Sequence, residues 1–347
     1  TGGGCPHILA EPERTNLFPY SEDFSNTAWS KFRSSLTINQ TTSPDGTINA
    51  YLIEQDYPNT SVHGGLADSI TMTSGVEYTY SFFVKKKEYS WIELAEAATS
   101  AANTSTWFDI ENGVVGIVGA GSTAQIKDFG NGWYRCSISF TSLNTSSRNL
   151  TLYLARGDGS TTADFEGGVY IWGAQLEAGS YGTSYIPNFG TALGVTRNQD
   201  IFTRDGIGSL INSTEGVLFV EAKVKIDTDF SANCFGISDG TDANRLSIIM
   251  YGNINSIRAS MNVGGVNQFD FNLSGYSREQ YYKIAVLYKA NDCRIFINGT
   301  KIATNISSTM PPTGTLDRLN FDLGTGLYKF FGKVKQLQVY DTALTDE

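Results

Sequence analysis

Two groups of aromatic and polar residues in this chain could bind a sugar without any covalent chemistry. Pyranose rings stack on tryptophan and tyrosine, while aspartate, asparagine and arginine side chains bond the hydroxyls. The first group is Tyr89, Trp91 and Trp107, and Tyr89 and Trp91 share a face if their segment is extended. The second group surrounds a loop-rich stretch and comprises Asp242, Arg245, Tyr251 and Asn253. Burial in a core or in a trimer interface is the alternative for each of them.

Motifs that suggest catalysis lack the context that the chemistry needs. Gly236–Gly240 reads G-x-S-x-G, but a nucleophile elbow needs a downstream histidine, and both histidines of the chain lie upstream. Gly119–Ala124 matches a dinucleotide fingerprint, yet turn and strand sequence follows it in place of a helix. Glu93 and Glu96 would point to opposite faces of a strand, so they cannot form the paired carboxylates of a glycosidase. We therefore expect a protein without enzyme activity.

Charge and cysteine content exclude several classes of function. The chain of 347 residues carries a net charge of −10, and its one basic run is Lys85–Lys87, which we expect to end a strand at the surface. Nucleic acid is a poor candidate ligand because its phosphates require a basic stripe. The four cysteines, at positions 5, 136, 234 and 293, show neither zinc spacing nor a dense disulfide framework. No apolar run approaches the ~20 residues of a membrane span.

The elements that position these residues are strands. Tyr78, Tyr80, Phe82 and Val84 alternate with Thr79 and Ser81, which predicts a half-buried strand. The segment "VEAKVKI", residues 220–226, alternates in the same way, and Asn298–Gly299 supplies the turn of a hairpin. No segment shows a convincing helical stripe, so we predict an all-β protein.

Two blocks of strands meet near residues 186–198. The segments "GWYRCSISF" before this seam and "QYYKIAVLY" after it share an aromatic pair, a basic residue and an alternating run. We therefore predict two tandem antiparallel β-sandwiches of similar topology. Trp172 lies in "VYIWGAQLE", a predicted strand with apolar residues on both faces. We therefore interpret Trp172 as a core residue, and the alternative is an aromatic platform for a ligand.

The first block resembles a module of bacteriophage structural proteins. The resemblance rests on "CPHILAEPERTNLFPYSEDFSNTAWSK", "DFGNGWYRCSISF" and "VYIWGAQLEAGSYGTSYIP". It implies a jelly roll akin to carbohydrate-binding modules. The second block, from "SLINSTEGVLFVEAKVKI" to "FFGKVKQLQVYDTALTDE", resembles a laminin-G/concanavalin-like sandwich. We accordingly expect a lead-in at residues 1–15, a jelly roll at 16–190 and a laminin-G-like sandwich at 191–347.

The resemblance also implies a metal, a location and a function. Related carbohydrate-binding modules often hold a structural Ca²⁺, for which Glu22, Asp23 and Glu177 are candidate ligands on the first and last strands of the first block. No cofactor is expected to be required. The resemblance implies a display or adhesion domain on a virion surface, in a tail or head fibre, assembled in the host bacterial cytoplasm and frequently homotrimeric. Both ends of the sequence look cut, so we expect a piece of a longer chain.

We therefore expect adhesion to host-surface polysaccharide, with other virion proteins as partners and with neither nucleic acid nor membrane insertion. The alternative is a purely structural capsid or tail decoration without a glycan ligand.

Overall fold

The structure confirms the all-β prediction. The computed structural model describes residues 7–56, 63–97, 104–162, 166–225, 232–252, 254–277 and 280–344. In these ranges every helix-or-strand element is a strand, and all pairings between named strands are antiparallel. No helix that could span a membrane occurs in this part of the chain.

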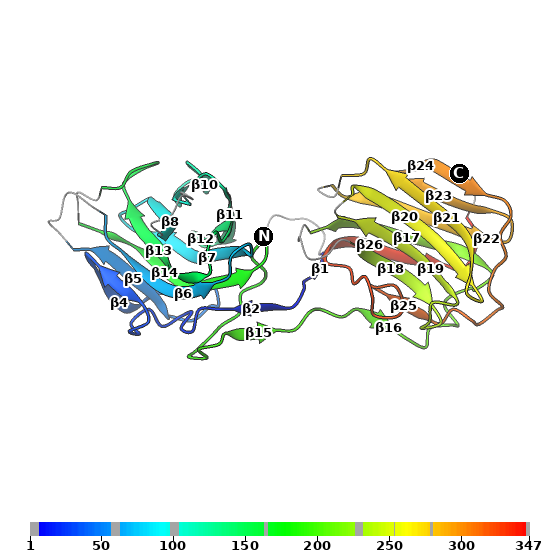
Figure 1. Ribbon diagram of the computed structural model, residues 1–347, viewed down its shortest axis with the longest axis horizontal. Coiled ribbons are helices and arrows are strands. Elements are labelled where there is room, and N and C mark those ends of the chain that lie inside the picture. The colour runs from blue at the N-terminus through cyan, green and yellow to red at the C-terminus, as the bar shows by residue number, and fades with distance from the viewer. Residues whose placement is uncertain are drawn as a thin grey trace. The chain divides into compact units, whose positions relative to one another are not determined.

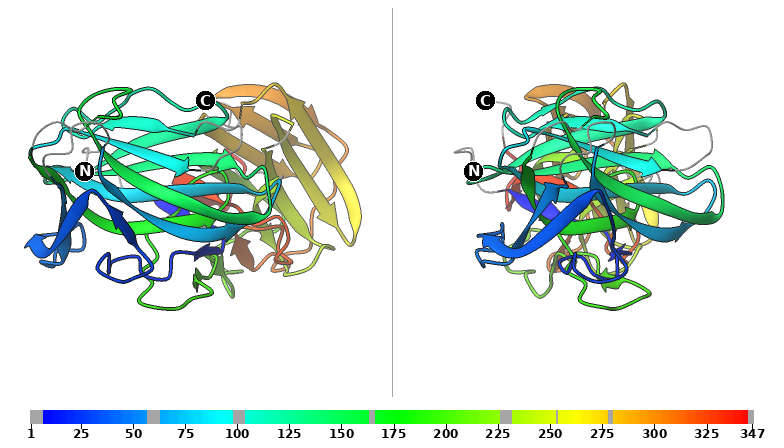
Figure 2. Two further views of the ribbon diagram at one scale, coloured as in Figure 1. Left: turned by 60° about the vertical axis from the view of Figure 1, so that its left-hand side comes forward. Right: turned by 90° about the vertical axis from the view of Figure 1, so that its left-hand side faces the viewer.

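The chain divides into two compact units. The first unit is Glu13–Asn198, and the second joins the described residues up to Pro12 to those from Gln199 onward. Each unit consists of two facing sheets (Figures 1 and 2). The chain therefore leaves the second unit after its first strand and returns to it only after the whole first unit is complete.

The first unit contains two six-stranded sheets and one short ladder. The first sheet, named here the β8 sheet, has the order β10 (Val114–Val115), β9 (Thr106–Asp109), β8 (Trp91–Ala97), β13 (Ser146–Ala155), β6 (Gly65–Met72) and β3 (Ser30–Phe32). The second, the β7 sheet, has the order β11 (Ser122–Gly130), β12 (Trp133–Thr141), β7 (Glu77–Lys86), β14 (Gly168–Ala178), β5 (Ala50–Gln55) and β4 (Ser34–Thr41). The short ladder pairs β2 (Arg14–Asn16) with β15 (Val195–Arg197).

The second unit contains two further six-stranded sheets. The β17 sheet has the order β1 (Ile8–Ala10), β26 (Gly332–Tyr340), β17 (Glu215–Val224), β22 (Tyr282–Lys289), β23 (Cys293–Ile297) and β24 (Thr300–Asn305). The β19 sheet has the order β16 (Thr203–Arg204), β25 (Arg318–Asn320), β18 (Ala232–Ser238), β19 (Arg245–Tyr251), β20 (Ser256–Val263) and β21 (Val266–Ser274).

Alternation along each strand fills the space between the facing sheets. On β7, Tyr80, Phe82 and Val84 are buried in the main core of the first unit, while Thr79 and Ser81 face away from it. Cys136 on β12 joins the same core as a fully buried, free thiol, as its position on the apolar face predicts. The core of the second unit is a separate cluster built mainly from the inner faces of β17, β19, β20 and β22.

Trp172 is buried, but on the outer face of the β7 sheet. It forms a second apolar cluster with Ala50, Phe83 and Trp133, which is separate from the main core. Tyr185, from the segment that follows β14, packs on Trp172 with 4.6 Å between ring centroids. The predicted core role of Trp172 is therefore confirmed. The residues after β14 fold back to cover this face, because the Ile186 amide donates to Gln175 Oε1 over 2.7 Å.

Two titratable side chains are buried on the outer face of the β8 sheet. Glu93 is 3% exposed and His63 is 6% exposed, and 3.6 Å separates Glu93 Oε2 from His63 Nδ1. Burial raises the pKa of Glu93 to about 7, against a hydrogen bond from Ser105 that lowers it. Burial and the charge of Arg33 lower the pKa of His63 to about 4. Both groups therefore favour their neutral forms in the folded protein.

Replacing Trp172 by alanine is expected to lower the free energy of unfolding by about 3 kcal/mol, because the change leaves a cavity between Phe83 and Tyr185. Urea denaturation measures this change, with Trp91→Ala as a control at a half-buried tryptophan. A loss no larger than that of Trp91→Ala would contradict the structural role.

Glu93→Gln is expected to stabilise the protein more at pH 8 than at pH 5. The folded-state pKa of Glu93 lies above its usual value of 4.5, so its contribution to stability is present below pH 4.5 and is lost as the pH rises through 7. The gain at pH 8 should exceed the gain at pH 5 by about 3 kcal/mol at most. Urea denaturation at the two pH values measures it, with exposed Glu111→Gln as the control. An equal gain in the free energy of unfolding at both pH values would show that ionisation of Glu93 does not destabilise the folded protein.

Candidate functional site

A polar face lies on the outside of the β19 sheet. Leu246, Ile248 and Met250 of β19 enter the core of the second unit, so Arg245 and Tyr251 project from the opposite face. We name this surface the outer β19 face. Its other polar members are Ser247 on β19 itself and, on the neighbouring strands, Ser238, Ser256, Arg258, Ser260, Asn262, Asp270 and Asn272. Arg245 and Tyr251 are six positions apart, which spans roughly 20 Å of strand.

A self-bonded turn connects β18 to β19 at one end of this face. Asp239 Oδ1 accepts bonds from the amide and the hydroxyl of Thr241, at 2.8 and 2.6 Å. Asp239 Oδ2 accepts a bond from Asn244 Nδ2 over 2.8 Å. Burial opposes ionisation of Asp239, but these hydrogen bonds outweigh it and hold its pKa below the usual value. Ser238 of the G-x-S-x-G motif is the last residue of β18, and its Oγ accepts the amide of Gly240 in the turn that follows.

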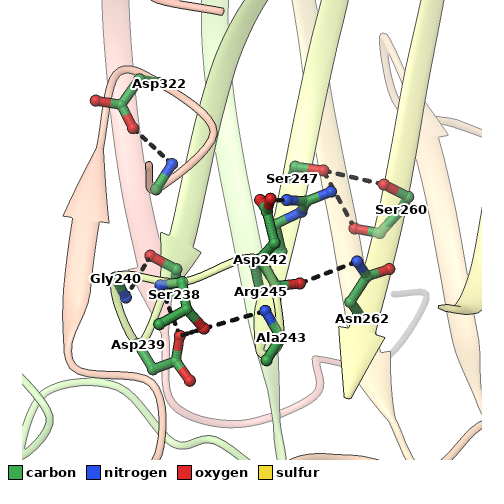
Figure 3. Close-up of polar contacts among 12 residues, drawn as sticks. Ser238, Asp239, Gly240, Asp242, Ala243, Arg245, Ser247, Ser260, Asn262 and Asp322 are labelled. Carbon is green, nitrogen blue, oxygen red and sulfur yellow. Dashed lines mark hydrogen bonds and ion pairs between the residues drawn. The ribbon is translucent and has the colours of Figure 1, made fainter. Parts of the chain in front are cut away.

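Three residues next to this turn form a fixed polar group. Arg245 Nη1 donates to Asp242 Oδ1, and Asn262 Nδ2 donates to the Asp242 carbonyl over 3.1 Å. The Asp242 carboxylate remains 65% exposed, whereas the Arg245 side chain is 16% exposed. Arg245 Nε has no acceptor among the described residues. Figure 3 shows Asp242, Arg245 and Asn262 together beside Ser247 and Ser260.

A second polar group lies at the other end of the face. Arg258 forms a two-pronged ion pair with Asp270, with Nε–Oδ1 and Nη2–Oδ2 distances of 2.7 Å. The hydrogen bond to Asp270 is the main reason that the pKa of Arg258 is raised, and a side-chain bond with Tyr251 adds to it. Between the two groups, Ser247 and Ser260 lie directly opposite each other, with 3.0 Å between their hydroxyls. Both serines are buried, so the polar groups that remain accessible on the face are those at its two ends.

Apolar residues on β18 and β19 occupy part of the outer β19 face, between Arg245 and Tyr251. Ala232, Cys234, Ile249 and Leu323 form a small buried cluster, against which Tyr251 packs. Burial also raises the pKa of the Cys234 thiol above its usual value. The polar groups of the outer β19 face therefore lie beside packed apolar residues, and the ring of Tyr251 packs against these residues.

The structure brings Asp242 and Arg245 of the second predicted group into contact and leaves Tyr251 at the other end of the same strand. Asp242, Arg245 and Tyr251 all belong to the outer β19 face, while Asn253 lies outside the described residues. Arg258 and Asp270 were not predicted from the sequence. The Gly264–Gly265 pair could have indicated them, because two glycines between alternating runs are typical of a tight turn that pairs the flanking strands. Both glycines have positive φ angles, and the strands on either side of them pair.

The first predicted group is divided by the structure. Tyr89 is 1% exposed and belongs to the main core of the first unit, so it cannot stack on a sugar and does not share a face with Trp91. Trp91 and Trp107 instead lie on the outer face of the β8 sheet, where Trp91 is half-buried. Trp107 is buried and its Nε1 donates to the Ser160 carbonyl. Glu93 and Glu96 of β8 face opposite sides, as the sequence predicts.

The three predicted calcium ligands do not form a common site. Glu22 accepts a bond from the Tyr185 hydroxyl over 3.1 Å, and Asp23 accepts one from the Tyr51 hydroxyl over 3.0 Å. Glu177 is fully buried and accepts the Thr183 amide over 2.9 Å. Among the described residues, no group of three or more histidine, cysteine, aspartate or glutamate side chains is arranged to hold a metal ion. Each of the three carboxylates is thus bonded within the protein, and a structural Ca²⁺ stays a prediction.

The chain is distantly similar to several solved structures. Sheep galectin-11 is 8% identical and covers 40% of this chain and 97% of its own, at a TM-score of 0.30. The SAP-like pentraxin of Limulus polyphemus is 15% identical over 40% of this chain and 68% of its own, at 0.29. Domains LG4–5 of the mouse laminin α1 chain are 8% identical over 98% of this chain and 90% of their own, at 0.32. Likenesses this distant carry no conclusion about a ligand.

A sequence family matches the second unit. No curated protein matches the chain. The model of a laminin-G family within the concanavalin A-like lectin/glucanases superfamily matches residues 215–347. This range contains β17 to β26, and therefore every strand that builds the outer β19 face. The second unit, which also includes β1 and β16 outside this range, thus contains a laminin-G/concanavalin A-like β-sandwich domain.

Proposed function

We propose that this protein binds a glycan through the outer β19 face and performs no reaction on it. The observation that carries the proposal is the pair of fixed polar groups on one sheet face, Asp242–Arg245–Asn262 and Tyr251–Arg258–Asp270. A lectin-type superfamily match over this domain supports it. Ion-paired arginine and aspartate side chains hold their remaining donors and acceptors in set directions, which suits the hydroxyls of a sugar.

The expected affinity of one such face is low. A hydrogen bond to a charged group contributes about 1.5–3 kcal/mol, and the ordering of a mobile sugar consumes part of that gain. A single face is therefore expected to bind with a Kd of about 1 mM to 10 μM. Several copies on one particle would raise the avidity by a factor of about 10²–10⁴.

The biological setting that we propose is the surface of a bacteriophage particle. The resemblance of the first block to modules of phage fibres supports a tail or head fibre that attaches to host-surface polysaccharide. In this proposal the chain is homotrimeric, contacts other virion proteins and is assembled in the host bacterial cytoplasm. Three copies would supply the multivalency that a weak site requires.

Arg258→Ala is expected to weaken glycan binding by about tenfold or more, because it removes a charged donor and releases Asp270. The measurement is an array of bacterial polysaccharides probed with the purified chain, followed by titration of any hit. Arg294→Ala is the matched control, since Arg294, on β23 of the other sheet, forms a similar two-pronged pair with Asp292.

Loss of binding in Arg294→Ala, or retention in Arg258→Ala, would refute the outer β19 face as the site. A silent array with a correctly folded chain would favour the alternative, a structural decoration protein without a glycan ligand.

A further inference from the structure

Three asparagines of this chain precede a glycine, and each of them lies in a turn. They are Asn112, Asn131 and Asn298, and all three are exposed. An asparagine in this position can react with the backbone that follows it, because glycine has no side chain to hinder the approach of its nitrogen. The same chemistry is therefore open to all three, and the hydrogen bonds around each one decide which of them reacts.

The reaction consumes only water and releases ammonia. The glycine nitrogen gives up its proton and bonds to Cγ of the asparagine, and the side-chain nitrogen leaves with that proton as ammonia. The product is a five-membered succinimide ring. Water then adds to one of the two ring carbonyls and breaks the bond from that carbon to the ring nitrogen. Opening at Cγ gives aspartate, whereas opening at the backbone carbonyl gives isoaspartate, in which the chain continues through Cβ and Cγ.

At Asn112 both reacting groups are bound to one neighbour. The Gly113 amide, which would be the nucleophile, donates to the Asp109 carbonyl over 2.9 Å. The Asp109 carboxylate accepts the Asn112 amide over 3.0 Å and the Asn112 side-chain Nδ2 over 2.8 Å. Ring closure at Asn112 must therefore first break hydrogen bonds to Asp109.

Asn298 is held by a residue of the neighbouring strand β22. Its amide donates to the Lys283 carbonyl over 2.8 Å, and its Oδ1 accepts the Lys283 amide over 3.0 Å. This reciprocal pair fixes the Asn298 side chain towards β22, whereas Cγ has to approach the Gly299 nitrogen before the ring can close. The turn from β23 to β24 is therefore protected at the side chain that would be attacked.

Asn131 has neither form of protection. It lies between Gly130 and Gly132 in the two-residue turn from β11 to β12, and φ is 53° at Asn131 and 79° at Gly132, as in a type I′ turn. Among the described residues, no side-chain hydrogen bond holds Asn131 and no backbone hydrogen bond occupies the Gly132 amide. Because β11 is the edge strand of its sheet, this turn can also open at low cost.

We propose that Asn131 is a site of spontaneous modification, which becomes aspartate and isoaspartate while Asn112 and Asn298 persist. Each conversion adds one negative charge to a chain whose net charge is −10. The site belongs to the first unit and does not depend on the proposed function of the outer β19 face.

The two products differ in their effect on the turn. Aspartate keeps the length of the backbone and tolerates a positive φ, so the turn persists. Isoaspartate adds one backbone carbon to a two-residue connection, which disrupts the pairing of Gly130 with Trp133. Trp133 is 2% exposed and packs in the outer cluster with Phe83 and Trp172, so loss of this pairing exposes its indole. Isoaspartate at position 131 therefore loosens the β11 edge of the β7 sheet.

Peptide mapping by mass spectrometry tests the site directly. The folded full chain is kept at pH 8, where the glycine nitrogen loses its proton more readily than at pH 5, and the peptides that contain Asn112, Asn131 and Asn298 are followed over time. We expect Asn131 to be converted at least about fivefold faster than either of the others, the factor that corresponds to breaking one ordinary hydrogen bond. The same chain unfolded in guanidinium chloride is the control, in which all three should react at similar rates.

Conversion of Asn112 or Asn298 as fast as that of Asn131 in the folded chain would overturn this inference. So would a folded chain in which Asn131 persists while the unfolded chain reacts. The variant Asn131→Asp contains the aspartate product alone and should melt at the same temperature as the fresh protein. Aged protein enriched in isoaspartate should melt at a lower temperature, with its tryptophan fluorescence shifted to the red. Equal melting temperatures for the aged protein and Asn131→Asp would overturn the proposed effect on the turn.

Discussion

Each strand of this protein has two faces, and one of them packs against the facing sheet of the same unit. The core clusters show this division: alternate residues of β7 and β19 are fully buried between sheets. The side chains between them must face outward, because the strand period of two allows no other direction. Binding chemistry in such a protein is therefore placed on outer sheet faces, next to side chains whose positions the core has already set.

Three of the four outer faces meet this constraint in different ways. The outer face of the β7 sheet is covered by the protein's own chain, and Trp172 is buried there under Tyr185. The outer β19 face remains polar and partly open, with ion-paired arginines on β19 and β20. The outer face of the β8 sheet combines aromatic borders with a buried carboxyl that lacks a full set of partners. Among the described residues, both of these last two faces contain hydrogen-bonding atoms without a partner in the protein, Arg245 Nε on one and Glu93 Oε2 on the other.

Alternation made much of the fold predictable from the sequence. It correctly placed Tyr80 and Phe82 inside, and it separated the faces of Glu93 and Glu96. It could not reveal that β1 pairs with β26, because three residues carry little pattern and their partner lies more than three hundred positions away. The long excursion of the chain through the first unit is equally invisible in local patterns.

The candidate sites were predictable only in part, for the same reason. Asp242 and Arg245 are neighbours in the sequence, so a loop with polar residues indicated them. The pairing of His63 with Glu93 depends on register across β6, β13 and β8, which no local pattern supplies. Tyr89 was misplaced because the extended segment begins only at Trp91, so Tyr89 does not follow the alternation of β8.

The central claim is that the outer β19 face receives a glycan, and the arginine side chains report on it directly. The Nε–H signals of arginine can be followed by NMR while a polysaccharide fragment that the protein binds is added. The account predicts saturable shifts for Arg245 and Arg258, which lie on this face, and none for Arg294 on the other sheet. Binding of the fragment without any shift at Arg245 and Arg258 would contradict it.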